Sequence, residues 1–183
     1  MNSVTGKPNR RSLLWTGVVL LTIILDQFTK FLAVRLLQPV DTVPIIRDVL
    51  HLTYVTNRGA AFGMLQNHRW VFLVVSTVAI VLLGYYLYMK KDASPLFCTA
   101  LAFIVGGGIG NMIDRILLGY VVDFVDFRLI HFAVFNNADS FVCVGCALIF
   151  IWILFSPEAK EQPAKQPEEA KAEEEGQHHD SDR

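Results

Sequence analysis

The chain has 183 residues, of which 53% are hydrophobic, and a formal net charge of -1. This apolar content is above what the core of a soluble domain of this length requires, which excludes an ordinary soluble protein. The charges are segregated, because residues 158–183 hold nine of the 17 acidic side chains but four of the 16 basic ones. The other basic residues are scattered rather than clustered, which argues against nucleic-acid binding.

The first long apolar stretch covers residues 13–25 and resumes after Asp26 as far as Leu37. A basic segment precedes it, as in a cleavable signal peptide. The hydrophobic region is too long for a signal peptide, however, and no small-residue cleavage site follows it. We therefore expect a retained transmembrane helix, in which Lys30 and Arg35 extend toward the far interface.

Residues 38–67 mix β-branched residues with two prolines and the turn-like sequence Asn57-Arg58-Gly59. This pattern favours short strands joined by turns, and we expect a small strand pair or sheet lying against the membrane. The turn is equally consistent with a plain connection and with a loop that contacts substrate. Residues 57–62 also suit a mobile apolar cover over a buried site.

Three further apolar runs cover residues 70–89, 96–113 and 141–155. The last is short: its fifteen residues make about 22 Å of helix, whereas the hydrocarbon core is about 30 Å thick. A proline and the acidic tail follow this run, so the missing residues are expected to come from Asn136–Ser140. Asp139 then lies at the outer margin of the membrane.

The predicted fold class is an all-α membrane protein with four transmembrane helices and a small extracytoplasmic β-containing loop region. The spans are expected at about residues 13–35, 70–89, 96–114 and 137–155. Residues 1–157 are expected to form a single membrane-embedded domain, followed by a disordered acidic cytoplasmic tail at 158–183.

Lysine and arginine positions predict the orientation. The short Lys90-Lys91 connection and the basic N-terminal segment belong in the cytoplasm under the positive-inside rule. Four spans then place both termini in the cytoplasm and residues 38–67 and 115–138 on the outer side. The polar residues near the span ends consequently gather at the outer face.

Asp123 and Asp139 are predicted to lie at the ends of two consecutive helices, at similar depth. Ionisable groups this close to hydrocarbon are costly and are candidates for function. Two carboxylates held together in low dielectric cannot both ionise, so the pair can activate a water and polarise a peptide carbonyl. Alternatively, each caps a helix or pairs with Arg115 or Arg128. That alternative is favoured for either aspartate alone, and catalysis is favoured for the two together.

The remaining polar residues favour structural roles. Asn111, Asp114 and Arg115 have i, i+3, i+4 spacing and share one helix face, which favours a hydrogen-bonded brace. The glycines at 106–110 are expected to let neighbouring helices approach closely.

Two other aspartates are weighed separately. Asp126 lies three residues after Asp123 and is its rival, but it suits a wetter loop position. Asp26 either pairs with Lys30 one turn later on the same helix or braces the outer site.

Five segments occur in a characteristic order: LDQFTK (25–30), TNRGAAFGML (56–65), GNMIDR (110–115), YVVDFVDF (120–127) and FNNADS (135–140). Together they resemble the motif regions of bacterial lipoprotein signal peptidase, the type II signal peptidase, over about residues 12–156. The resemblance implies an intramembrane aspartic peptidase of the bacterial inner membrane. It would remove the signal peptide of a prolipoprotein just before the diacylglyceryl-modified Cys. Separately, we expect a monomer in contact with membrane lipids, without cofactor or metal.

Matched motif to motif, the resemblance gives Asp123 and Asp139 the catalytic positions. Supporting or substrate-binding positions fall on Asp26, Asn57, Gly59, Asn111, Asp114, Arg115 and Asn136. A small transporter or lipid-binding protein that uses the same buried carboxylates as a proton relay is the alternative. The lack of an inverted repeat weakens it.

Overall fold

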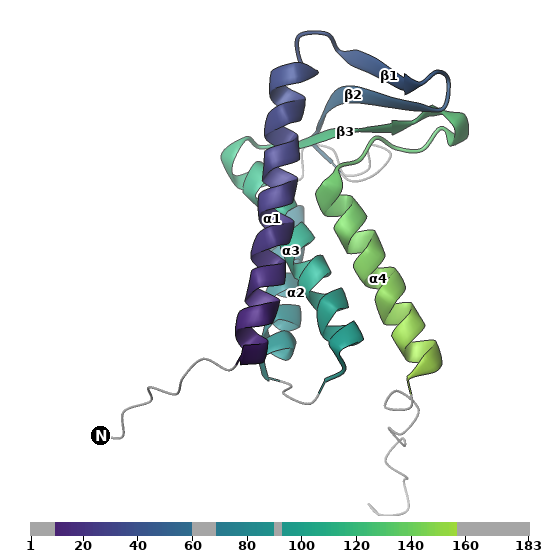
Figure 1. Ribbon diagram of the computed structural model, residues 1–183. Helices are drawn as coiled ribbons and strands as arrows, with labels where there is room; N and C mark the ends of the chain where they lie inside the picture. Colours follow the sequence, from purple (N-terminus) through teal and green to yellow (C-terminus); the bar gives the residue numbers. More distant parts are fainter. Residues whose placement is uncertain (1–9, 60–68, 90–92, 157–183) are drawn as a thin grey trace, which may run out of the picture. The chain divides into compact units, whose positions relative to one another are not determined.

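The computed structural model describes residues 10–59, 69–89 and 93–156. In chain order the elements are α1 (Arg10–Leu36), β1 (Thr42–Ile46), β2 (Leu50–Asn57), α2 (Arg69–Met89), α3 (Pro95–Leu117), β3 (Val121–Phe127), η2 (Arg128–Ile130) and α4 (Asn137–Phe155) (Figure 1). The acidic tail at 158–183, the Lys90-Lys91 connection and residues 60–62 of the expected cover lie outside the described residues. The chain divides into two compact units, residues 1–149 and 150–183.

Four helices in the described part of the chain are long and apolar enough to cross a membrane. α1 has 27 residues and is about 40 Å long, so it extends beyond a hydrocarbon core of about 30 Å. α4 has 19 residues and begins at Asn137, before the fourth apolar run. Together with a small sheet, these helices confirm the predicted fold class.

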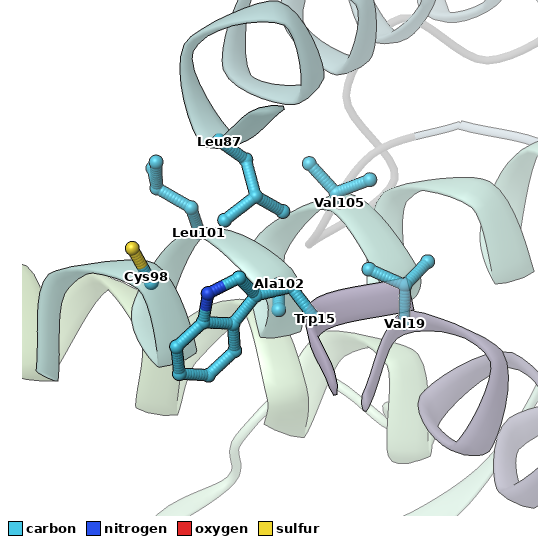
Figure 2. Packing of buried hydrophobic residues seen from close by; sticks show 7 residues of the cluster. All are labelled: Trp15, Val19, Leu87, Cys98, Leu101, Ala102 and Val105. Carbon is cyan, nitrogen blue, oxygen red and sulfur yellow. The ribbon is translucent and has the colours of Figure 1, made fainter. Parts of the chain in front are cut away.

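α3 lies between its neighbours, because both α1 and α2 pack against it. Figure 2 shows the apolar cluster at this junction. Trp15 and Val19 come from α1 and Leu87 from α2, whereas Cys98, Leu101, Ala102 and Val105 come from α3. The side chains that α3 contributes include a buried alanine and a buried cysteine, and small residues let membrane helices approach closely.

The expected role of the glycines on α3 is confirmed at two positions. A Cβ at Gly107 would lie 2.5 Å from the carbonyl oxygen of Ala138, in the first turn of α4. A Cβ at Gly110 would collide with the carboxylate of Asp26 on α1. Only glycine at these two positions allows α3 to pack this closely against α4 and α1.

The three strands form one antiparallel sheet in the order β1-β2-β3. Thr42 pairs with Thr53, and Val55 pairs with Asp123. Strand β3 corrects the prediction, which expected strands only within residues 38–67. The first four residues of β3 are all buried, so the segment lacks the alternation of apolar and polar residues that marks a half-exposed strand.

A second apolar cluster joins the sheet to the helices. It contains Ala33 and Leu37 at the C-terminal end of α1 and Val122 and Phe124 of β3. On the way to α4, Phe135 pairs with Val125 in a short bridge. β3 therefore packs against the end of α1 and pairs with the segment that leads into α4 (Figure 1).

Candidate active site

Asp123 is the third residue of β3, and its side chain is 1% exposed. The sequence placed it at the end of a helix, and that prediction is wrong. Antiparallel pairing with β2 fixes the position of β3. The chain then passes through η2 before α4 begins. A strand fixes the direction of a side chain through its ladder of backbone hydrogen bonds, so Asp123 is presented on a rigid element.

Asp139 lies in the first turn of α4. Its Oδ2 accepts from the backbone N–H of Asn136 at 3.2 Å, and its own N–H donates to Oδ1 of Asn136 at 3.1 Å. This reciprocal pair is a capping box at the start of the helix. Both the cap and the positive end of the helix dipole favour a carboxylate at this position.

Asn136 joins the two aspartates. While its Oδ1 caps α4, its Nδ2 donates to Oδ1 of Asp123 at 2.6 Å and to Oδ1 of Asn111 at 3.1 Å. The residue is 0% exposed. Asn111 in turn donates from Nδ2 to Oδ1 of Asp139 at 2.7 Å. Two amides therefore hold the two carboxylates in one network.

Asn57 holds the other oxygen of Asp123. Its Nδ2 donates to Oδ2 of Asp123 at 3.0 Å, and its Oδ1 accepts from the N–H of Gly59 at 2.9 Å. Arg115 donates to the carbonyl oxygen of Gly59 at 3.4 Å. Of the two interpretations of the Asn57-Arg58-Gly59 turn, these contacts favour a loop that forms part of the site over a plain connection.

Arg115 contributes a positive charge to the site from the C-terminal part of α3. Its guanidinium lies 5.0 Å from the centre of the Phe72 ring on α2. A guanidinium over an aromatic face is attracted by the ring electrons, which holds the cation in place. The predicted brace of Asn111, Asp114 and Arg115 is thus divided. Arg115 lines the cavity and Asn111 bonds Asp139, whereas Asp114 accepts from Gln27 and from the backbone N–H of Val122.

The two aspartates open into a cavity of about 590 Å³. Its walls are mainly apolar. The lining residues are Asn57, Phe72, Arg115, Asp123, Phe132, Ala133, Val134, Phe135, Asp139, Ser140, Cys143 and Val144. A largely apolar cavity with a few convergent polar groups is typical of a binding site for an organic ligand.

The pKa of Asp123 differs from that of an ordinary carboxyl group. Burial raises the pKa of Asp123 to about 7, and the nearby charge of Asp139 adds to the rise. The hydrogen bonds from Asn57 and Asn136 oppose it. One proton is therefore held by the pair near neutral pH, leaving one group able to donate and the other to accept.

Asp26 and Asp114 are buried, are not among the cavity-lining residues of the described chain, and share a cation. Lys30 Nζ is 2.9 Å from Oδ2 of Asp26 and 3.2 Å from Oδ2 of Asp114. Of the two alternatives for Asp26, the pairing with Lys30 is observed. The expectation that Lys30 extends to the interface is wrong, because its side chain is 4% exposed and points into the bundle.

The same two carboxylates tether the elements that carry the site. Oδ1 of Asp26 accepts from the N–H of Ala138 at 2.9 Å, and Oδ2 of Asp114 accepts from the N–H of Val122 at 3.0 Å. Ala138 precedes Asp139, and Val122 precedes Asp123. Each structural aspartate therefore holds the residue next to a candidate catalytic aspartate.

Asp126, the rival of Asp123, lies elsewhere. Its Oδ2 accepts from Thr53 at 2.8 Å and from Nε of Arg128 at 2.9 Å, and it is not among the cavity-lining residues of the described chain. Burial raises the pKa of Asp126, but the hydrogen bonds from Arg128 and Thr53 and the nearby positive charge of Arg128 together outweigh this effect, so the pKa is lowered.

Sequence reasoning missed some residues around the site. Gln27 donates to Asp26 and Asp114, each at 3.1 Å, and carried no signal beyond its place in the first motif. Phe72 lines the cavity from a segment that is apolar throughout, and Phe132 lines it from the connection between η2 and α4. A uniformly apolar run does not indicate which side chains face a cavity.

Comparisons with known proteins give matches over most of the chain. The signal peptidase (SPase) II family model matches residues 18–155. The lipoprotein signal peptidase of Caldanaerobacter subterraneus subsp. tengcongensis is 49% identical over 138 residues, which cover 75% of this chain and 94% of that protein. That of Clostridioides difficile is 46% identical over 143 residues, which cover 78% and 96%. A solved structure described as a bacterial membrane enzyme, determined by the in meso method at 2.3 Å resolution, aligns with a TM-score of 0.73 and 28% identity, over 84% of this chain and 93% of that chain.

Proposed function

The chain belongs to the signal peptidase II family, and from this premise we propose that Asp123 and Asp139 are its catalytic pair. The protein is a peptidase that removes signal peptides from prolipoproteins. Use of the carboxylates as a transporter's proton relay is not favoured, because the family and its relatives are peptidases.

The proposed reaction uses one proton shared by the pair. Ionised Asp139 accepts a proton from a water, whose oxygen attacks the scissile carbonyl carbon, while protonated Asp123 donates to the carbonyl oxygen. The resulting gem-diol collapses. Asp139 then returns its proton to the amide nitrogen as the C–N bond breaks, and a diol hydroxyl returns a proton to Asp123. The products are a carboxyl group and an amine, and the pair regains its starting state.

The observation that carries this proposal is the network at Asn136. One buried amide bonds Asp123 and caps the helix that begins with Asp139, and both carboxylates open into the same cavity. Groups held by fixed amides need little reorganisation as charge moves between them. Asp26, Asn57, Gly59, Asn111, Asp114, Arg115 and Asn136 are proposed to support the pair or bind substrate.

The apolar walls favour a lipid-bearing substrate. Phe72, Phe132, Val134 and Val144 line the cavity beside the aspartates. We propose cleavage just before a diacylglyceryl-modified Cys, whose acyl chains would lie against these side chains and remain in contact with membrane lipids. Burial of the chains would supply binding energy away from the reacting bond.

The proposed setting is the bacterial inner membrane, with both termini cytoplasmic and the aspartates toward the outer face. Residues 1–157 are proposed to act as one peptidase domain, as a monomer, without help from residues 158–183. The positive-inside rule supports this orientation.

The decisive experiment uses the purified full chain in detergent with a diacylglyceryl-modified precursor peptide. We expect one cut, immediately before the modified Cys, identified by mass spectrometry. The same peptide with an unmodified Cys is the control, and it should be cut far more slowly. Equal cleavage of both peptides would contradict the lipid requirement. An unchanged cleavage rate after replacement of either aspartate would contradict the catalytic pair.

A further inference from the structure

Lys30 bonds one neutral group in addition to the two carboxylates that compensate its charge. Its ammonium bonds Asp26 and Asp114 and also donates to Oδ1 of Asn111 at 2.9 Å. An ammonium has three donors and no acceptor, so these three partners use its full capacity. Two carboxylates are sufficient to compensate a buried cation. The third bond points toward the candidate catalytic pair.

The third bond determines which way the Asn111 amide faces. Because an ammonium only donates, the atom of Asn111 that faces Lys30 has to be Oδ1. Asn136 donates to that same oxygen at 3.1 Å. Nδ2 of Asn111 is then directed to Oδ1 of Asp139, at 2.7 Å. A flipped amide would place its NH₂ group against two donors.

We propose that Lys30 is a positioning residue for the reaction, acting through Asn111 to present Asp139 as a proton acceptor. With the amide held, Oδ1 of Asp139 meets a donor, which suits a carboxylate. With the amide free to turn, Oδ1 of Asn111 faces Asp139 and suits the protonated acid instead. This inference rests on the proposed catalytic pair, because it concerns the ionisation of Asp139 before water attack.

Gln27 is the matched control on the same helix. Its Nε2 donates to Asp26 and Asp114, each at 3.1 Å, and to the carbonyl oxygen of Gly110 at 3.2 Å. It thus braces the same two carboxylates as Lys30, but no bond from it to Asn111 occurs in the described part of the chain. Removing either side chain weakens the brace, and removing Lys30 also releases the amide.

The test compares Lys30→Met with Gln27→Met in the full chain, using cleavage of a lipid-modified peptide as a function of pH. We expect Lys30→Met to lower kcat about 10-fold or more, with KM changed less than about 2-fold, and to move the acidic limb of the profile to higher pH. Gln27→Met should lower the thermal midpoint while leaving the profile in place. Lys30→Arg, which keeps a donor-only cation, should restore the acidic limb.

Lys30→Met leaves two buried carboxylates without their cation and could fail to fold. Lys30→Met combined with Asp114→Asn keeps the net charge of the cluster unchanged and supplies the measurement in that case. If the profile of the folded variant matches that of Gln27→Met, Lys30 is only a brace and the proposal is overturned.

Asp123→Asn in the same assay separates this inference from the proposed function. If Asp123→Asn is inactive while Lys30 has no special effect, only the positioning role fails. If Asp123→Asn cleaves normally, the catalytic pair itself is wrong.

Discussion

Nδ2 of Asn136 donates to Oδ1 of Asp123 across 2.6 Å, so the residue that caps α4 also binds the carboxylate carried by β3. A helix start and a strand are thereby joined by one buried side chain. The relationship explains how two aspartates on different kinds of element reach the same cavity. It also means that the start of α4 and the catalytic geometry cannot be altered separately.

Replacing either of the two proposed catalytic aspartates should abolish cleavage. Asp123→Asn and Asp139→Asn keep the size of the side chain. The first removes the proton donor to the scissile carbonyl oxygen, and the second removes the acceptor of the water's proton. General acid–base help is worth about 10²–10⁴-fold, and loss of the shared water adds to that. The double variant should be no worse than either single one, because each change dismantles the same unit. Single-turnover cleavage in detergent measures the rates.

Asp126→Asn is the matched control for these changes, because Asp126 lies on the same strand but bonds Thr53 and Arg128. It should keep most of the activity. Turnover by Asp123→Asn at a tenth of the wild-type rate, a difference of about 1.4 kcal/mol in barrier, would be too fast for the two-aspartate mechanism.

Asp123→Asn should also raise stability at alkaline pH. The pKa of Asp123 is about 7 in the folded protein, against 3.8 for the free side chain. Below pH 3.8 the carboxyl is protonated in both states and costs nothing. Between these two pKa values the carboxyl is ionised in the unfolded chain and still protonated in the folded protein. Folding is therefore progressively disfavoured as pH rises, by up to roughly 4 kcal/mol above pH 7. The melting temperature of the variant relative to wild type should therefore be higher at pH 8 than at pH 4, and the pH-dependent gain should vanish at about pH 3.

The same melting experiment on Asp126→Asn should give the opposite sign. The pKa of Asp126 is lowered, so its carboxylate stabilises the fold above the unfolded pKa and loses that effect as pH falls through the folded value. Asp126→Asn should melt lower than wild type at pH 8. A rise for both variants would point to a general effect of charge removal rather than to the environment of Asp123.

Asn57→Ala should move the alkaline limb of the activity profile. In the wild type, activity should fall as pH rises through about 7, because Asp123 then loses the proton that it donates. The bond from Asn57 opposes the rise in the pKa of Asp123, so its removal should shift this limb to higher pH while lowering the maximal rate. Cleavage measured from pH 5 to 9 tests this (about two units to each side of the pKa). An alkaline limb displaced to lower pH would contradict it.

Gly107→Ala should weaken both folding and cleavage. Its Cβ would lie 2.5 Å from the backbone oxygen of Ala138, so α4 has to move away from α3 and carry Asp139 with it. Overpacking of this kind costs about 1–3 kcal/mol. Gly84→Ala on α2 is the control, since a Cβ there meets nothing within 4 Å among the described residues. Gly84→Ala should be neutral or slightly stabilising, and equal losses in thermal midpoint for the two variants would argue against the close approach of α3 and α4.

Reporter fusions test the orientation. A fusion at Gln66 should report the outer side and a fusion at Lys91 the cytoplasm, because an apolar helix that can cross the membrane separates the two sites. Signals from the same side would contradict the predicted topology.

The four helices could be predicted because hydrophobicity along a chain is a local property, and a run of about 20 apolar residues has few alternatives in a membrane. The short fourth run even located the start of α4, since it lacked the length to span. The two catalytic candidates and most of their neighbours could be named from motif resemblance.

The direction of the side chains could not be predicted in the same way. On a helix, Asp123 and Asp126 would share a face, whereas on β3 residues three apart point to opposite sides, and this separates them. Likewise, the ammonium of Lys30 could have reached water or the bundle, and its partner Asn111 is 81 residues away. Burial and hydrogen bonding depend on segments that are distant in sequence, so the places of Lys30, Asn111 and Asn136 follow from how the helices and the sheet pack together.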